Sequence, residues 1–180
     1  MKKVLLGLGI IAAILVAMFF VFRKYTKSFS PEELVVYDDG NIKLEVSYNR
    51  PWKKDRVIFG GLVPYGKVWR TGANEASTFS SNKEISIKGK TLKPGKYSLW
   101  TIPEADYWTI IFNTQTGQWG INAKGEANRV AERDALQVIV PAVFQEKVFE
   151  QFTISFEPHD DEIEMVLMWD QTVVVVPISR

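Results

Sequence analysis

Residues 4–22 form an unbroken apolar segment of 19 residues without a charged side chain. At about 1.5 Å per residue, a helix of this length spans roughly 28 Å, which is close to the hydrocarbon thickness of a bilayer. Two lysines precede the segment, and Arg23, Lys24 and Lys27 follow it. We therefore expect residues 1–27 to form a membrane anchor with basic flanks, whose partner is the lipid bilayer.

A cleaved signal peptide is the competing interpretation of this segment, because it also begins with positive charge. Its apolar core is ordinarily 7 to 15 residues long and ends in a small-residue cleavage site, whereas this segment is longer and ends in Met18–Phe22 and a basic cluster. The number of basic groups is nearly equal on the two sides of the segment, so this number does not decide its orientation in the membrane. The short, signal-like N-terminal tail favours a single-pass protein with an extracytoplasmic C-terminal domain; a cytoplasmic domain is the alternative.

The rest of the chain has the length and pattern of one β domain. We expect a polar linker over residues 28–34 and a single domain over residues 35–180. Residues 41–48 alternate apolar and polar side chains, as a half-buried strand does. Further strand-like segments follow at 56–59, 76–80, 84–88, 97–102, 107–112, 135–140, 152–156, 163–169 and 172–178.

About ten short antiparallel strands with frequent turns predict an all-β fold, a β-sandwich or jelly-roll-like domain. An immunoglobulin-type sandwich without its disulfide is the second choice. Asp170 and Gln171 are expected to form the tight turn of a final hairpin, and residues 123–134 are the one place outside the anchor where a short helix fits.

Composition excludes several kinds of site. The chain has no Cys and one His, so it offers no thiolate nucleophile, and a zinc site is not expected. His159 lies among three acids in an exposed turn, without the spacing of a calcium loop. Glycine-rich dinucleotide or phosphate-loop motifs are absent. We expect no metal, no cofactor and no nucleic-acid partner, and no protein partner is identified.

Residues 56–78, RVIFGGLVPYGKVWRTGANEAST, form the predicted functional segment. Four glycines and a proline imply backbone corners, and polar side chains on corners beside buried strands often bind ligands. The candidate ligand-binding residues here and nearby are Arg50, Arg56, Trp69, Arg70, Asn74, Glu75 and Trp119. Arginine supplies a fixed fork of donors for a carboxylate or phosphate, and asparagine both donates and accepts.

A purely structural role for this segment is an open alternative: Arg70 would pair with Glu75, Asn74 would hold a turn and Trp69 would fill the core. Charge is also divided, since residues 40–96 hold 12 Lys and Arg against 4 Asp and Glu. This excess favours an anionic ligand if the basic residues share a face, but strands from both halves of the domain can also interleave.

These residues resemble a bacterial domain-of-unknown-function family of secreted and membrane-attached proteins. Its signature, IFG-LVPYG-WR-GANE, corresponds to Ile58–Gly60, Leu62–Gly66, Trp69–Arg70 and Gly72–Glu75. Matches continue through Pro94–Leu99, Thr101–Pro103, Trp108–Asn113 and Gln118–Gly120. The resemblance covers roughly residues 35–180 and implies a mostly β extracytoplasmic domain of a bacterial membrane, on the periplasmic side. It implies no reaction.

The chain departs from this family at two places. Gln137 stands where a basic residue is common, and Ala123–Glu126 replace acidic and aromatic residues expected after the Gln-Trp-Gly loop. A pocket that extends there would bind a different ligand or bind it more weakly.

Three functions follow as hypotheses. The first is a membrane-tethered domain that binds a small polar or anionic ligand, or an envelope partner, through residues 56–78, with Arg70 as the anion anchor and Trp119 as a cover. The second is a hydrolase with Glu75 as general acid or base and a second carboxylate from residues 97–180. The third is a structural envelope module. Catalysis is the less favoured of these, and no catalytic residue is assigned.

Overall fold

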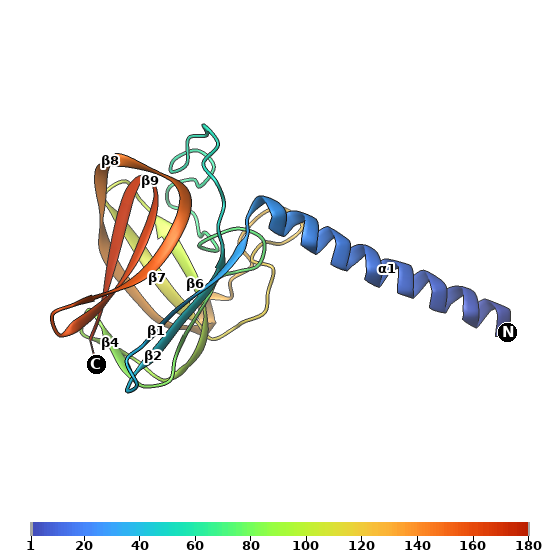
Figure 1. Cartoon of the computed structure of the whole chain (residues 1–180), viewed down its shortest axis with the longest axis horizontal. Helices are drawn as coiled ribbons and strands as arrows, with labels where there is room; N and C mark the ends of the chain where they lie inside the picture. Colours follow the sequence, from blue (N-terminus) through green and yellow to red (C-terminus); the bar gives the residue numbers. More distant parts are fainter. Residues whose placement is uncertain (1, 180) are drawn as a thin grey trace.

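The computed structural model describes residues 2–179 and consists of one long helix followed by a nine-stranded antiparallel sheet (Figure 1). The all-β class with an N-terminal helix is thereby confirmed. A single 3-10 turn, Ala131–Arg133, interrupts the loop before β8. The elements are α1 (Lys2–Phe29), β1 (Glu32–Asp38), β2 (Lys43–Asn49), β3 (Thr78–Ser81), β4 (Ile85–Ile87), β5 (Lys90–Leu92), β6 (Gly95–Pro103), β7 (Tyr107–Asn113), β8 (Asp134–His159) and β9 (Glu162–Ser179).

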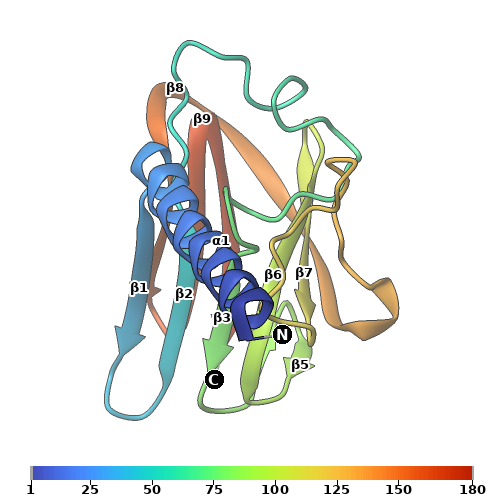
Figure 2. The same cartoon turned by 90° about the vertical axis from the view of Figure 1, so that its right-hand side faces the viewer.

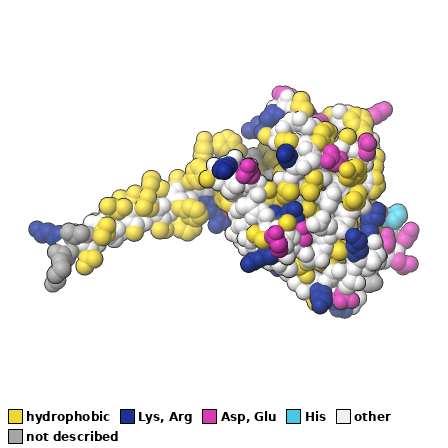
Figure 3. All heavy atoms as spheres, turned by 180° about the vertical axis from the view of Figure 1, so that it is seen from behind, with side chains coloured by type: hydrophobic (Ala, Val, Ile, Leu, Met, Phe, Trp, Pro, Cys, Tyr) yellow, Lys and Arg dark blue, Asp and Glu magenta, His cyan; other side chains and the backbone are white. Residues whose placement is uncertain are grey.

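Helix α1 projects away from the sheet and leaves its apolar side chains exposed (Figure 3). By length and composition it can cross a membrane, as an anchor or as a signal sequence. The helix continues to Phe29 and β1 begins at Glu32. The linker predicted over 28–34 is therefore reduced to Ser30 and Pro31.

The strand order is β1-β2-β3-β6-β7-β8-β9-β4-β5. Figure 2, seen from the helix side, shows β1, β2, β3, β6 and β7 next to one another with β9 behind them. The sheet folds back on itself, because the chain after β2 meets the second half of β8: Phe152 N–H donates to Pro51 O at 3.0 Å and Lys53 N–H donates to Glu150 O at 2.7 Å. The result is a two-layered, nearly closed β structure around one core.

Strand β8 joins the two layers. Its first residues pair with β7 up to Pro141, and from Ala142 onward it pairs with β9. Its register with β9 shifts on both sides of Phe149. The two short strands predicted at 135–140 and 152–156 are both part of β8, and those predicted at 163–169 and 172–178 are both part of β9. The prediction of a hairpin turn at 170–171 is wrong. Asp170 has a left-handed φ of 53° inside β9 and pairs with Phe149, so it forms an irregularity and no chain reversal.

Alternating side chains explain why these strands bury one face. Leu44, Val46 and Tyr48 of β2 are 0–1% exposed and point into the main core. Tyr48 also links the layers, because its hydroxyl accepts a hydrogen bond from Ile154 N at 2.8 Å. Burial raises the pKa of Tyr48 to about 12.

The first part of the predicted functional segment closes one end of the core. Ile58 is fully buried, and Phe59 packs edge-on against Trp108 with ring centroids 4.9 Å apart. Trp69 stacks on Trp169 at 5.9 Å. Residues 56–59 do not form the predicted strand; only an isolated bridge joins Phe59 to Val63.

Two smaller differences concern turns. Strand β5 was not predicted; it pairs with β4 across Lys88 and Gly89, whose φ values of 50° and 74° suit a tight hairpin turn. The short helix considered for 123–134 reduces to the 3-10 turn, and the rest of that segment is loop.

Candidate functional site

The corner at residues 71–75 projects the polar side chains of the predicted segment. Thr71 and Asn74 have left-handed φ values of 55° and 56°. Gly72 has φ 153°, and a Cβ there would lie 2.9 Å from Asn49 O, so the chain can pass β2 this closely only with glycine. Ser77 Oγ donates to Thr71 O at 2.7 Å and locks the corner.

Glu75 lies at the junction between this corner and helix α1. Its Oε1 accepts a hydrogen bond from Arg23 Nε at 2.6 Å and lies 3.6 Å from Lys27 Nζ. Its Oε2 accepts from Asn49 Nδ2 at 3.2 Å. Glu75 is therefore held by the basic flank of the apolar helix, and it does not form the ion pair with Arg70 that a structural role predicted.

Electrostatics keep Glu75 ionised. Burial raises its pKa, but the hydrogen bond from its own backbone N–H and the charges of Lys27 and Arg23 outweigh this effect, so its pKa is lowered overall. A second carboxylate lies close by, because Lys27 Nζ also contacts Glu32 Oε2 at 2.5 Å. The expectation that a second carboxylate would come from residues 97–180 is not met, since the neighbour of Glu75 belongs to β1.

Glu75 opens into a polar cavity of about 280 Å³ between the helix end, the outer face of β1–β2–β3 and the loop after β7. The cavity contains groups of both charges, hydroxyls and amides, and it is partly open to solvent. Its lining consists of Arg23, Glu32, Ser47, Asn49, Glu75, Ala76, Thr78, Lys96, Thr116, Gly117 and Gln118.

Asn74 supports the wall of this cavity. Its Nδ2 donates to Asn49 Oδ1 at 3.3 Å and to Ser30 O at 3.4 Å. Asn49 is 3% exposed. Its side-chain amide connects Asn74 with Glu75, because Oδ1 accepts from Asn74 and Nδ2 donates to Glu75. Sequence reasoning missed Asn49, because it ends an alternating strand where nothing distinguishes it from a turn residue.

Arg70 points to a different place. Its side chain runs against Gly120, where a Cβ would lie 2.6 Å from Arg70 Cδ. Burial lowers the pKa of Arg70, an effect that the charge of Glu75 partly opposes. The atom Nη1 is buried and has no hydrogen-bond partner in the described part of the chain.

Trp119 is partly buried in the loop beside Gly120. The cavity wall formed by this loop consists of Thr116, Gly117 and Gln118, so Trp119 does not provide the expected cover.

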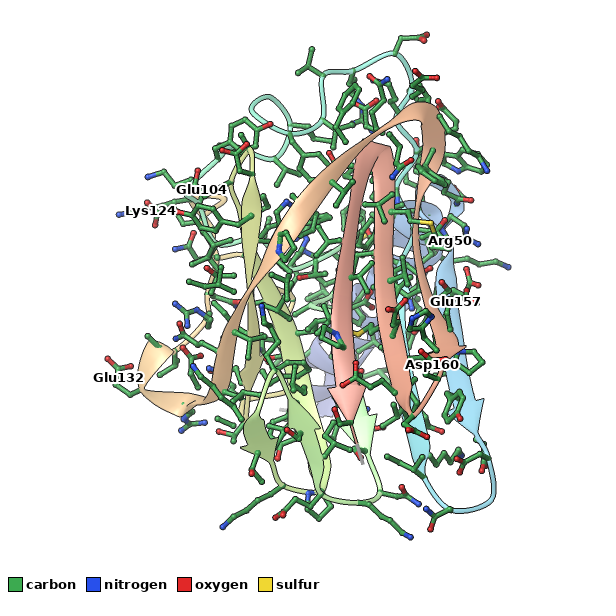
Figure 4. All side chains as sticks on the ribbon, turned by 90° about the vertical axis from the view of Figure 1, so that its left-hand side faces the viewer. Arg50, Glu104, Lys124, Glu132, Glu157 and Asp160 are labelled. Carbon is green, nitrogen blue, oxygen red and sulfur yellow. The ribbon has the colours of Figure 1, made fainter. Side chains whose placement is uncertain are left out.

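The other three predicted residues lie outside the cavity. Arg50 forms an ion pair with Glu33 and donates to Thr153 Oγ1 at 2.9 Å, so it joins β1 to β8. Figure 4 shows Arg50 at the opposite edge of the molecule from Lys124, which belongs to the loop after β7. Arg56 donates to Lys53 O and Trp52 O within its own loop. Trp69 belongs to the aromatic core cluster.

Three further residues that line the cavity were given other roles in the sequence analysis. Arg23 was assigned to the membrane flank and Glu32 to the linker, and Lys96 was counted among the basic residues of 40–96. Only the folding of the chain brings them to Glu75, which is 52 residues from Arg23.

The described residues contain no group of three or more His, Cys, Asp or Glu side chains that could hold a metal ion. His159 is 67% exposed in the β8–β9 turn, and its one ion-pair neighbour is Asp160 at 3.8 Å. It is an exposed side chain in an acidic turn, as predicted.

Comparison with known proteins gives a family and no activity. No curated protein matches the chain significantly, and no solved structure does. One family model, described as a protein of unknown function (DUF2911), matches residues 30–178, which covers β1 to β8 and all of β9 except its last residue. The chain therefore belongs to the DUF2911 family.

Proposed function

We propose that this protein is a membrane-anchored domain that binds a small polar ligand in the cavity beside Glu75. The observation that carries the proposal is the position of Glu75: a signature acid, held ionised, faces a 280 Å³ cavity and not the core. Pockets of this kind bind through a few fixed polar groups, and here Asn49, Thr78 and Gln118 supply neutral ones. We further propose that the domain lies on the extracytoplasmic side of a bacterial membrane.

The helix end is part of the proposed site. Arg23 lines the cavity and contacts Glu75, so the ligand would bind next to the membrane surface, where the helix leaves the bilayer. A ligand with a positive or hydrogen-donating group would compete with Arg23 for Glu75.

A binding function fits Glu75 better than general acid catalysis. A general acid or base works best with a pKa near the operating pH, whereas the pKa of Glu75 is lowered. The neighbouring Glu32 nevertheless supplies a second carboxylate, which keeps a hydrolase as the second candidate. Mass spectrometry of a bound molecule after incubation decides between them: an unchanged molecule supports binding, and a cleaved one supports hydrolysis.

The test is a thermal-shift screen of small polar molecules on the full chain in detergent. A ligand should raise the melting temperature of the wild type, and Glu75→Gln should remove that increase. Glu45→Gln is the matched control, because Glu45 lies on β2, pairs with Lys43 at 2.8 Å and does not line the cavity. If no molecule stabilises the wild type and Glu75→Gln lowers stability by itself, Glu75 serves only to dock the helix.

A further inference from the structure

Arg70 is a partly buried cation whose Nη1 atom is buried, and the charge of Glu75 acts on it without forming an ion pair. Glu75, the acid nearest to it in the sequence, pairs with Arg23 and Lys27. In the part of the chain that the structure describes, no acidic side chain forms an ion pair with Arg70. Arginine does not escape burial by losing its proton. A charged group that is partly removed from water without an ion-pair partner destabilises the fold.

Three more buried polar atoms without partners lie in the loop that covers Arg70: Gln115 Oε1, Gln118 Oε1 and Asn128 Oδ1. The loop is bound to the same corner, since Ala76 N donates to Gln118 O at 3.2 Å and Asn128 N donates to Gly120 O at 3.3 Å. Below it lies a small second apolar cluster of Ala76, Trp100 and Ile111. Buried polar groups of this kind ordinarily find a partner in the protein, in water or in a ligand.

We infer that the ligand of this corner carries a carboxylate or phosphate group, and that Arg70 pairs with this group beneath residues 115–128. The inference rests on the proposed function and names the chemistry of its ligand. A guanidinium binds such groups through parallel N–H bonds, and the side-chain amide of Asn128 can turn its NH₂ group toward an anion.

A ligand that fills the cavity would have to pass Gln118 to reach Arg70. Gln118 and Ala76 line the cavity, and Gly120, two residues after Gln118, packs against both Ala76 and the Arg70 side chain. Gly117 and Gly120, with φ of 85° and 100°, lie on either side of Gln118 and Trp119. The uncharged part of the ligand would stay beside Glu75 while its acidic group reaches Arg70.

The test compares anions on the full chain in detergent. Melting temperature is measured in sodium phosphate, sodium acetate and sodium chloride at equal ionic strength. Phosphate or acetate should stabilise the wild type saturably, by several degrees above chloride. Arg70→Met should melt no lower than the wild type in chloride, because it removes an unpaired charge, and should lose the anion-dependent increase.

Arg129→Met is the matched control. Arg129 is 13% exposed and pairs with Asp134, so its loss should lower the melting temperature and leave the anion effect intact. The inference is overturned if Arg70→Met and Arg129→Met respond equally to phosphate and acetate. If a neutral molecule stabilises the chain through Glu75 while no anion acts through Arg70, the inference fails and the proposed function stands.

A phosphate group can belong to a soluble molecule or to a lipid. The same three proteins are therefore compared in vesicles of a phosphate-free glycolipid, with and without phosphatidylglycerol. Stabilisation that depends on Arg70 and appears only with phosphatidylglycerol identifies a lipid headgroup, and stabilisation by soluble phosphate in detergent identifies a free anion.

Discussion

At the scale of single residues, the conformation of residues 71–75 decides the chemistry of the site. Arg70 and Glu75 are five positions apart, and sequence alone suggests that they pair. Left-handed φ values at Thr71 and Asn74, with Gly72 between them, send the two side chains to different neighbours. Side-chain direction after such corners depends on close backbone packing, which periodicity does not encode, so the sequence could not predict the partners of Arg70 and Glu75.

Glu75 should make stability depend on acid pH. Its folded pKa is lowered below the ordinary value of 4.5, so its contribution to stability is present above that pH and is lost as pH falls through the lower, folded pKa. Glu75→Gln should start from a lower melting temperature at neutral pH and lose less on acidification. Melting curves between about pH 7 and 2 check this: the two series should converge, and parallel series would contradict it.

The hydroxyl of Tyr48 should contribute to the free energy of unfolding. Tyr48→Phe leaves the buried N–H of Ile154 without its acceptor and should cost about 1–3 kcal/mol of unfolding free energy. Denaturant titration measures this cost. Tyr107→Phe is the control, because Tyr107 is 44% exposed, and it should change stability by less than about 0.5 kcal/mol. Equal effects of the two substitutions would refute a linking role for the Tyr48 hydroxyl.

At the scale of elements, the loop between β7 and β8 covers the outer face of the sheet and holds Arg70 in place. Gly120 is its tightest point. Gly120→Ala should displace Arg70 and cost more than about 1 kcal/mol, the usual cost of strain at a left-handed glycine. Gly125→Ala has a similar φ of 80° and nothing within 4 Å, so it should cost only that strain. Chemical denaturation compares the two, and equal costs would show that the loop yields freely around Arg70.

Strand prediction succeeded where alternation was regular, but it missed β1 and β5, placed a strand at 56–59 that does not form, and divided strands in which the chain changes direction. β2, β3, β4, β6 and β7 lie close to the predicted ranges. β8 and β9 were each divided in two, because an interruption in alternation looks the same whether the chain bends, bulges or reverses. The exposed residues 143–148 of β8 carry no burial signal, although they continue the strand between the two layers.

At the scale of the whole molecule, the helix and the domain meet at the candidate site, since Arg23 and Lys27 contact Glu75 (Figure 1). If the domain is extracytoplasmic, as we propose, a protease added outside spheroplasts should degrade residues 30–179 while a cytoplasmic marker protein stays intact. Full protection of the domain until the membrane is broken would place it on the cytoplasmic side.

The closure between Pro51–Lys53 and Glu150–Phe152 links segments about a hundred residues apart. Such long-range pairing slows folding, because the entropy of closing a large loop is lost before the contacts form. During synthesis the helix and β1–β2 leave the ribosome long before β8. Pro51 O and Lys53 N–H therefore lack their hydrogen-bond partners until Glu150 and Phe152 have been synthesised. A chain truncated before residue 150 should therefore be a substrate for proteases and chaperones, even though its helix and candidate site would be complete in sequence.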